Sequence, residues 1–150
     1  MSRLHKFLNL PCADRNCRIE AAFWLGFARL AILILPFRRI TPFLGRNMAQ
    51  SPEVEEVAHR ELLDRISWAV TTASRHLPWD CLCLVQAMAG KAMLKRRGLT
   101  STLYLGLAKD AEAQLQAHAW LRCGNRILTG GDGEGVEGFT IIATFAEDGK

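Results

Sequence analysis

Two cysteines near the middle of the chain could do chemistry, because they stand where a helix is expected to begin. Cys81 and Cys83 open the stretch CLCLVQAMAGKAMLKRRG, which ends in basic residues and a glycine. A thiol is a useful nucleophile only as the thiolate, and a helix N-terminus or a nearby imidazolium stabilises that form. First-turn amides also lack intrahelical acceptors and can donate to an oxyanion. With Asp80 as N-cap, this turn would combine a nucleophile and an oxyanion site.

His118 is the histidine that lies well inside a predicted strand, on the face opposite a row of apolar residues and beside Trp120. A cysteine on a helix and a histidine on an adjacent strand form the arrangement that thiol acyl transfer requires. We expect the cysteine-bearing helix to cover the face of the sheet that carries His118. The alternative is structural, because a buried cysteine is commonly a small hydrophobe and a strand histidine is commonly only hydrogen-bonded.

The apolar stretch Ile19–Phe37 is expected to form the first helix and to stop near Leu35, before the two prolines of LPFRRITPFLG, with a turn following. Glu20 and Arg29 interrupt the stretch, and a central arginine costs about 2.5–3.5 kcal/mol on membrane-insertion scales. Three placements stay open for this stretch. It packs on its own protein or a partner, it lies on a membrane surface, or it spans the membrane.

Helix-capping residues and the periodicity of apolar residues predict the remaining helices and strands. Ser51 as N-cap and Pro52 at the first helical position predict the start of an amphipathic helix. Gly98 predicts a left-handed stop for the cysteine-bearing helix. After it the apolar period changes to two, which predicts strands over STLYLGL, QLQAHAWLRC, RILT and FTIIATF. Gly124 and Asn125 predict a tight turn between the second and third of these strands.

Composition indicates a globular protein with a real core, since 49% of the 150 residues are hydrophobic and 23% are charged. The net charge of +4 is mild and scattered, without the interleaved aromatic residues of single-strand binders, so no nucleic-acid partner is expected. Five cysteines with no secretion-signal layout favour free thiols in a cytoplasmic protein. No CxxC pair is present, so no structural metal and no cofactor is expected.

The segments CLVQAMAGKAMLKRRG, TLYLGLAKD and AHAWLRCGNRI together resemble the leader peptidase of lasso-peptide biosynthesis, a small transglutaminase-like cysteine protease. The likeness covers residues 78–145, and FWLGFARLAILILPFRR resembles the apolar leading helix of that family. The resemblance implies a peptidase with a Cys, His and Asp triad that removes the leader from a ribosomally made precursor. It also implies a separate small protein that recognises the leader and an ATP-dependent cyclase that closes the ring.

Carried onto this chain, the resemblance places the nucleophile on Cys83, where CLVQA begins, and the base on His118 of AHAW. Cys81 is then a spare thiol. The acid of the family lies on the strand after the histidine, where this chain reads LTGGDGEG, so the resemblance implies Asp132, with Glu134 and Glu137 behind it.

Strand register leaves the third member of the triad open. With a two-residue turn, His118 would pair with Gly131 and Asp132 would point to the other face, whereas a β-bulge or a three-residue turn would place Asp132 opposite His118. A backbone carbonyl or an amide is the alternative partner for the ring.

The predicted fold class is α+β. N-terminal helices precede a papain- or transglutaminase-like core, in which the cysteine-bearing helix packs on a small, mostly antiparallel sheet of three or four strands. We expect residues 1–50 to be an N-terminal apolar helical segment and residues 51–150 to be the transglutaminase-like cysteine peptidase core.

The expected function is removal of the leader from a lasso-peptide precursor. Two alternatives stay open: a transglutaminase-like acyl transferase that passes the acyl group to an amine, and a non-catalytic peptide-binding assembly module. The resemblance implies three partners, which are the precursor peptide, the small leader-recognition protein and the ATP-dependent lasso cyclase. A membrane surface is a further candidate partner through Ile19–Phe37, so the expected location is the cytoplasm, with membrane association as an alternative.

Overall fold

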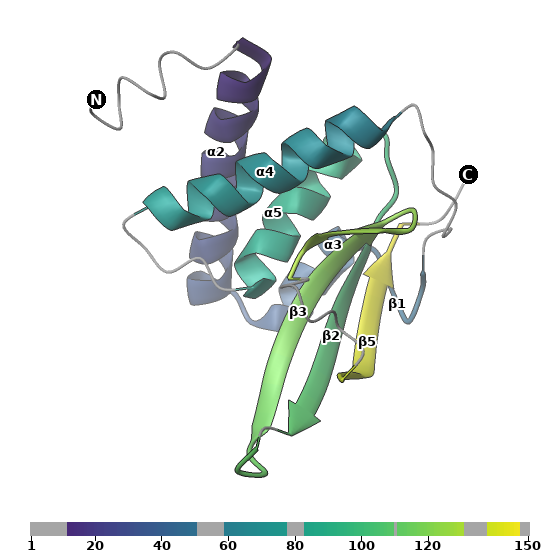
Figure 1. Cartoon of the computed structure of the whole chain (residues 1–150). Helices are drawn as coiled ribbons and strands as arrows, with labels where there is room; N and C mark the ends of the chain where they lie inside the picture. Colours follow the sequence, from purple (N-terminus) through teal and green to yellow (C-terminus); the bar gives the residue numbers. More distant parts are fainter. Residues whose placement is uncertain (1–11, 51–58, 78–82, 110, 131–137, 148–150) are drawn as a thin grey trace.

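The computed structural model describes residues 12–50, 59–77, 83–109, 111–130 and 138–147. These residues form an α+β structure, which confirms the predicted fold class. Figure 1 shows a group of helices beside a curved antiparallel sheet, with the hairpin of β2 and β3 projecting beyond the helices. Four helices are described: α2 Cys12–Ile34, α3 Phe37–Leu44, α4 Arg60–His76 and α5 Cys83–Arg96.

The long helices form in the regions that the sequence predicts. α2 ends at Ile34, next to the expected stop, and α5 is followed by Gly98 in a left-handed conformation, with φ of 76°. Ser51 and Pro52 lie outside the described residues, so the predicted cap stays a prediction. Within the described parts of the chain, no helix has the length and hydropathy that crossing a membrane would require.

α3 occupies residues for which the sequence predicts a turn, and that prediction is wrong. Pro36 precedes the helix in an extended conformation, with φ of −64° and ψ of 145°. Pro42 lies inside the helix and has no N–H to give to the carbonyl of Arg38. The hydroxyl of Thr41 donates to that carbonyl instead, at 3.1 Å. A side chain therefore satisfies the acceptor that the proline leaves open.

The sheet has the strand order β1-β5-β2-β3-β4, and its neighbouring strands pair antiparallel. Its strands are β1 Arg46–Asn47, β2 Thr102–Lys109, β3 Leu115–Cys123, β4 Arg126–Thr129 and β5 Thr140–Ala146. The four longer strands confirm the period-two pattern. β1, which the sequence does not predict, is a two-residue strand that pairs with the end of β5. Gly124 and Asn125 form the expected turn between β3 and β4.

α5 packs against β3 and β4 on the face of the sheet that carries the leucine row. Leu103 and Leu121 are fully buried in the core there. Gly90 allows the close approach, because a Cβ at that position would lie 2.8 Å from Cδ2 of Leu121. The prediction that this helix covers the face carrying His118 is wrong. A period of two separates the faces of a strand but does not say which face a helix covers.

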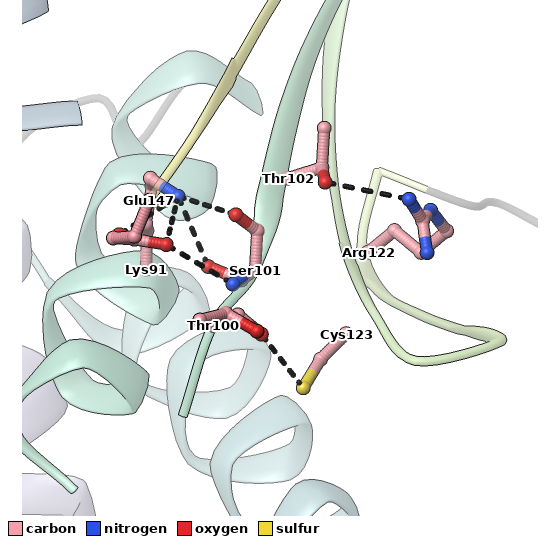
Figure 2. A network of polar contacts seen from close by, with 7 residues as sticks. All are labelled: Lys91, Thr100, Ser101, Thr102, Arg122, Cys123 and Glu147. Atoms are coloured by element: carbon pink, nitrogen blue, oxygen red, sulfur yellow. Dashed lines mark hydrogen bonds and ion pairs between the residues drawn. The ribbon is translucent and has the colours of Figure 1, made fainter. Parts of the chain in front are cut away.

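A buried lysine ties α5 to the sheet (Figure 2). The side chain of Lys91 is 2% exposed, and its Nζ donates to the carbonyl oxygen of Ser101 at 2.6 Å and to Oε2 of Glu147 at 3.1 Å. The amide of Ser101 donates to the same carboxylate oxygen at 3.1 Å. Burial lowers the pKa of Lys91, and Glu147 opposes that shift. The network joins the helix that begins at Cys83 to the segment leading into β2 and to Glu147, the residue that follows β5.

Lys91→Met should destabilise the fold by about 3–5 kcal/mol, because the substitution leaves the largely buried carboxylate of Glu147 without its cation. Chemical denaturation followed by circular dichroism measures the change. Glu61→Ala is the matched control, since Glu61 is 89% exposed in its ion pair with Arg65 and should change stability by less than about 1 kcal/mol. Equal stability of Lys91→Met and the wild type would contradict an anchoring role for the network.

Candidate active site

Cys83 is the first residue of α5, and its free thiol is half-buried at the N-terminal end of the helix. The backbone amide of Ala119 donates to Sγ at 3.4 Å. Ala119 directly follows His118 in β3 and lies beyond the last β3–β4 pair, which joins Leu121 to Thr129. The structure therefore brings Cys83 to the stretch of β3 that carries His118. The imidazole lies on the face of β3 that α5 does not cover, and no hydrogen bond joins Sγ of Cys83 to His118 among the described residues. The helix packs on one face of the sheet, and its first residue reaches the strand beside the histidine.

His118 is oriented by a backbone carbonyl. Its Nε2 lies 2.5 Å from the carbonyl oxygen of Gly130. A carbonyl can only accept a hydrogen bond, so Nε2 carries the proton and, in the neutral ring, Nδ1 holds the lone pair. Gly130 has a φ of 78°, and a Cβ there would lie 2.4 Å from the carbonyl oxygen of Ala119. Glycine is required at this position to bring the carbonyl to the ring.

Aromatic side chains surround the histidine ring. The ring centroid of His118 lies 5.1 Å from that of Phe139 and 6.0 Å from that of Trp120. Trp120 in turn stacks on Tyr104 with centroids 5.3 Å apart. Gly106 pairs with His118 across β2 and β3, and a Cβ at Gly106 would lie 2.8 Å from the indole of Trp120. These contacts restrict the imidazole to one orientation.

The sequence places Trp120 beside His118 but does not predict that Tyr104, Phe139, Gly106 and Gly130 belong to the site. Gly106 carries a weak signal, because a glycine inside a strand often marks a close approach of other atoms. Phe139 carries no such signal in the sequence. It lies just before β5, and β2 separates β5 from β3, the strand that carries His118. Only the folded chain shows that its ring reaches His118.

The register of β4 bears on the third member of the triad. Arg122 pairs with Ile127, whereas Leu121 pairs with Thr129, so β4 contains one extra residue between these pairs. The sequence predicts that Asp132 lies opposite His118 if the hairpin contains such a bulge. Asp132 itself lies outside the described residues, so its role stays a prediction.

Four other residues of the sequence-based site also lie outside the described residues. They are Asp80, Cys81, Glu134 and Glu137. In the part of the chain that the structure describes, no group of three or more His, Cys, Asp or Glu side chains could hold a metal ion. The described part of the candidate site supplies a thiol, an imidazole, a carbonyl that orients the imidazole, and the amides of a helix N-terminus.

A family model described as the transglutaminase-like superfamily matches residues 31–144. The match includes Cys83, His118 and every described strand except the last residues of β5. It describes the superfamily as a whole and contains nothing specific to lasso-peptide leader peptidases. Comparison with curated proteins and with solved structures gives no significant match.

Proposed function

The chain belongs to the transglutaminase-like superfamily, and on this basis we propose that it is a cysteine peptidase that removes the leader from a ribosomally made lasso-peptide precursor. Domains of this superfamily are typically cysteine proteases or acyl transferases. The observation that carries the proposal is the position of Cys83, whose sulfur accepts from the amide next to His118 at 3.4 Å. The resemblance of CLVQA, LGLAKD and AHAW to leader peptidases supports the choice of substrate.

In the proposed reaction, substrate binding brings the thiol of Cys83 and the imidazole of His118 together, and Nδ1 of His118 takes the thiol proton. The sulfur attacks the scissile carbonyl carbon, and the resulting oxyanion accepts hydrogen bonds from first-turn amides of α5. The protonated imidazole then gives its proton to the leaving amine as the C–N bond breaks, which leaves a thioester on Cys83. Water attacks the thioester, loses a proton to Nδ1 and releases the leader as a carboxylic acid, while the sulfur regains a proton.

Asp132→Ala should reduce kcat/KM by less than about 100-fold, because the carbonyl of Gly130 already orients the imidazole through Nε2. Steady-state cleavage of the precursor measures the change. An unaffected rate would indicate that Glu134, Glu137 or the carbonyl of Gly130 alone acts as the third member of the triad. A loss as large as that of a His118 variant would show that the carbonyl is insufficient.

An acyl transferase and a peptidase share the thioester and differ in the acceptor that resolves it. Cleavage in the presence of an excess of a simple primary amine separates the two. We expect the leader to be released as the free carboxylic acid. An amide of the added amine as the main product would favour the acyl transferase.

We also propose that the small leader-recognition protein presents the precursor and that the ATP-dependent cyclase acts on the released core. The described helices, α2 and α3 included, and the four longer strands contribute to one hydrophobic core. No segment among them forms a separate leader-binding module.

At low-micromolar precursor, cleavage should be at least about ten-fold faster with the recognition protein encoded nearby than without it. Tethering raises the effective concentration of the leader beside Cys83 toward the millimolar range. The measurement is the initial rate of leader release in the two reactions. Equal rates would show that this chain binds its own substrate, and the partner would be dropped from the proposal.

A further inference from the structure

α2 presents most of its large apolar side chains to solvent, and apart from Leu25 the residues that it buries are small. The residues buried against α4 and α5 are Cys17, Ala21, Leu25 and Ala28. Six apolar residues, each between 54% and 66% exposed, form what we call the α2 apolar face: Ile19, Phe23, Phe27, Leu30, Leu33 and Ile34. A surface helix of a globular protein normally has the opposite arrangement, with polar residues outward. An exposed apolar patch of this length marks a binding surface.

A cavity of about 610 Å³ opens beside the α2 apolar face, between α2, α3 and α5. Phe27 belongs both to the face and to the lining of the cavity. Phe43 of α3, which is 73% exposed, lines it from another side, and Met88 and Ala92 of α5 contribute further apolar atoms. The volume lies in the range of small-molecule sites, so an apolar chain fits inside.

Basic residues flank both the cavity and the face. Lys95 and Arg96 of α5 belong to the cavity lining, and Arg96 remains 67% exposed although it pairs with Glu20. Arg38 and Arg39 on α3 are exposed. Both acidic residues of α2 are engaged by arginines, and α3 has no acidic residue. The charge around the apolar surface is therefore positive.

We propose that the α2 apolar face binds the surface of an anionic bilayer. α2 lies in the plane of the interface, an acyl chain of one lipid enters the cavity, and its phosphate contacts Lys95 and Arg96. An outward apolar stripe with flanking cations is the composition of interfacial helices, and cations near an anionic membrane strengthen the binding. A second copy of the chain fits less well, because it would bring the arginines of α3 and α5 against their own equivalents.

The proposed orientation leaves the active site accessible. The basic residues lie at the C-terminal end of α5, whereas Cys83 lies at its N-terminal end. A helix of 14 residues is about 20 Å long, so Cys83 stands about that far from the membrane-bound end. The surface proposed here is therefore independent of the peptidase chemistry and does not rest on it.

The test is sedimentation of the full chain with vesicles of phosphatidylcholine and phosphatidylglycerol in a 3:1 ratio, compared with phosphatidylcholine alone. The wild type should sediment with the anionic vesicles and detach as salt rises. Phe23→Ser combined with Phe27→Ser should weaken vesicle binding at least about ten-fold, since both side chains are solvent-exposed and carry the contact. Leu115→Ser is the matched control, because Leu115 is 67% exposed at the start of β3, and it should bind like the wild type.

Circular dichroism of the double variant checks that the fold is intact. Absence of binding to anionic vesicles, or equal binding by the folded double variant, would overturn the proposal. So would light scattering that shows a dimer of the wild type which Phe23→Ser and Phe27→Ser dissociate. Co-elution of the recognition protein with the wild type but not with the double variant, without any vesicle binding, would assign the face to a protein partner instead.

Discussion

Cys83→Ala should abolish cleavage of the cognate precursor, with a loss on the order of 10⁴-fold or more in kcat, while Cys81→Ala keeps most of the activity. The reason is that, in the proposed mechanism, Sγ of Cys83 attacks the carbonyl carbon and carries the thioester. Without it, only substrate binding and oxyanion contacts remain. Mass spectrometry of the released leader and core peptides measures the rate.

Cys81→Ala is the control that separates the two thiols, because it removes the same group two residues earlier in the chain. The match to CLVQA and the hydrogen bond from the amide of Ala119 both favour Cys83. An inactive Cys81→Ala variant together with an active Cys83→Ala variant would show that the nucleophile is assigned to the wrong cysteine. The melting temperature of each variant confirms that the fold persists.

His118→Ala should lower kcat/KM by on the order of 100-fold or more, since a positioned base typically contributes 10²–10⁴-fold. In the proposed mechanism, the imidazole accepts the thiol proton at Nδ1 and later gives it to the leaving amine. His118 is half-buried and lies outside the main core cluster, so the variant should fold. Steady-state kinetics and thermal unfolding measure the two properties on the same sample.

His118→Gln is the conservative variant for this prediction. Its side-chain amide can still donate to the carbonyl of Gly130, but it cannot accept a proton at neutral pH. We therefore expect His118→Gln to be as slow as His118→Ala. Restored activity in His118→Gln would assign a packing role to the residue. A folded His118→Ala variant with near-wild-type turnover would remove the imidazole from the mechanism.

Local signals were sufficient to predict most of the elements that position the site. The basic end of α5 and the left-handed Gly98 locate its C-terminus, and the period of two locates β2 and β3. These features depend on residues close in the sequence, and for that reason they can be read from it. These elements also place a cysteine at the start of a helix and a histidine on a strand next to it, whereas the catalytic pairing of the two stays a prediction.

The parts that sequence reasoning misses depend on contacts between distant residues. α3 persists through Pro42 because the hydroxyl of Thr41 satisfies a carbonyl, which no propensity rule predicts. α5 packs on the leucine row because Gly90 leaves room for the side chain of Leu121. The alternation of residues along a strand does not indicate which face of the sheet a helix covers. The bulge in β4 depends on how β4 pairs with β3 and not on the residue types in β4. The sequence therefore does not decide which group contacts the ring of His118.

Other predictions concern properties that the packing of the chain does not test. The division into residues 1–50 and 51–150, the cytoplasmic location and the lasso-peptide partners stay predictions. A superfamily fold supports many substrates, because specificity depends on the surfaces around a site rather than on the helix and strands that hold its thiol and imidazole.

The most direct test of the central claim is the rate at which iodoacetamide alkylates each cysteine at pH 6, resolved by peptide mass spectrometry. Cys12 is exposed and Cys83 is only half-buried, so accessibility alone would make Cys12 react first. A catalytic thiolate would reverse that order. We expect Cys83 to react at least about ten-fold faster than Cys12 in the wild type. In His118→Ala we expect Cys83 to lose this difference in rate. Slower alkylation of Cys83 than of Cys12, or unfolding of the protein when Cys83 is modified, would contradict its role as the nucleophile.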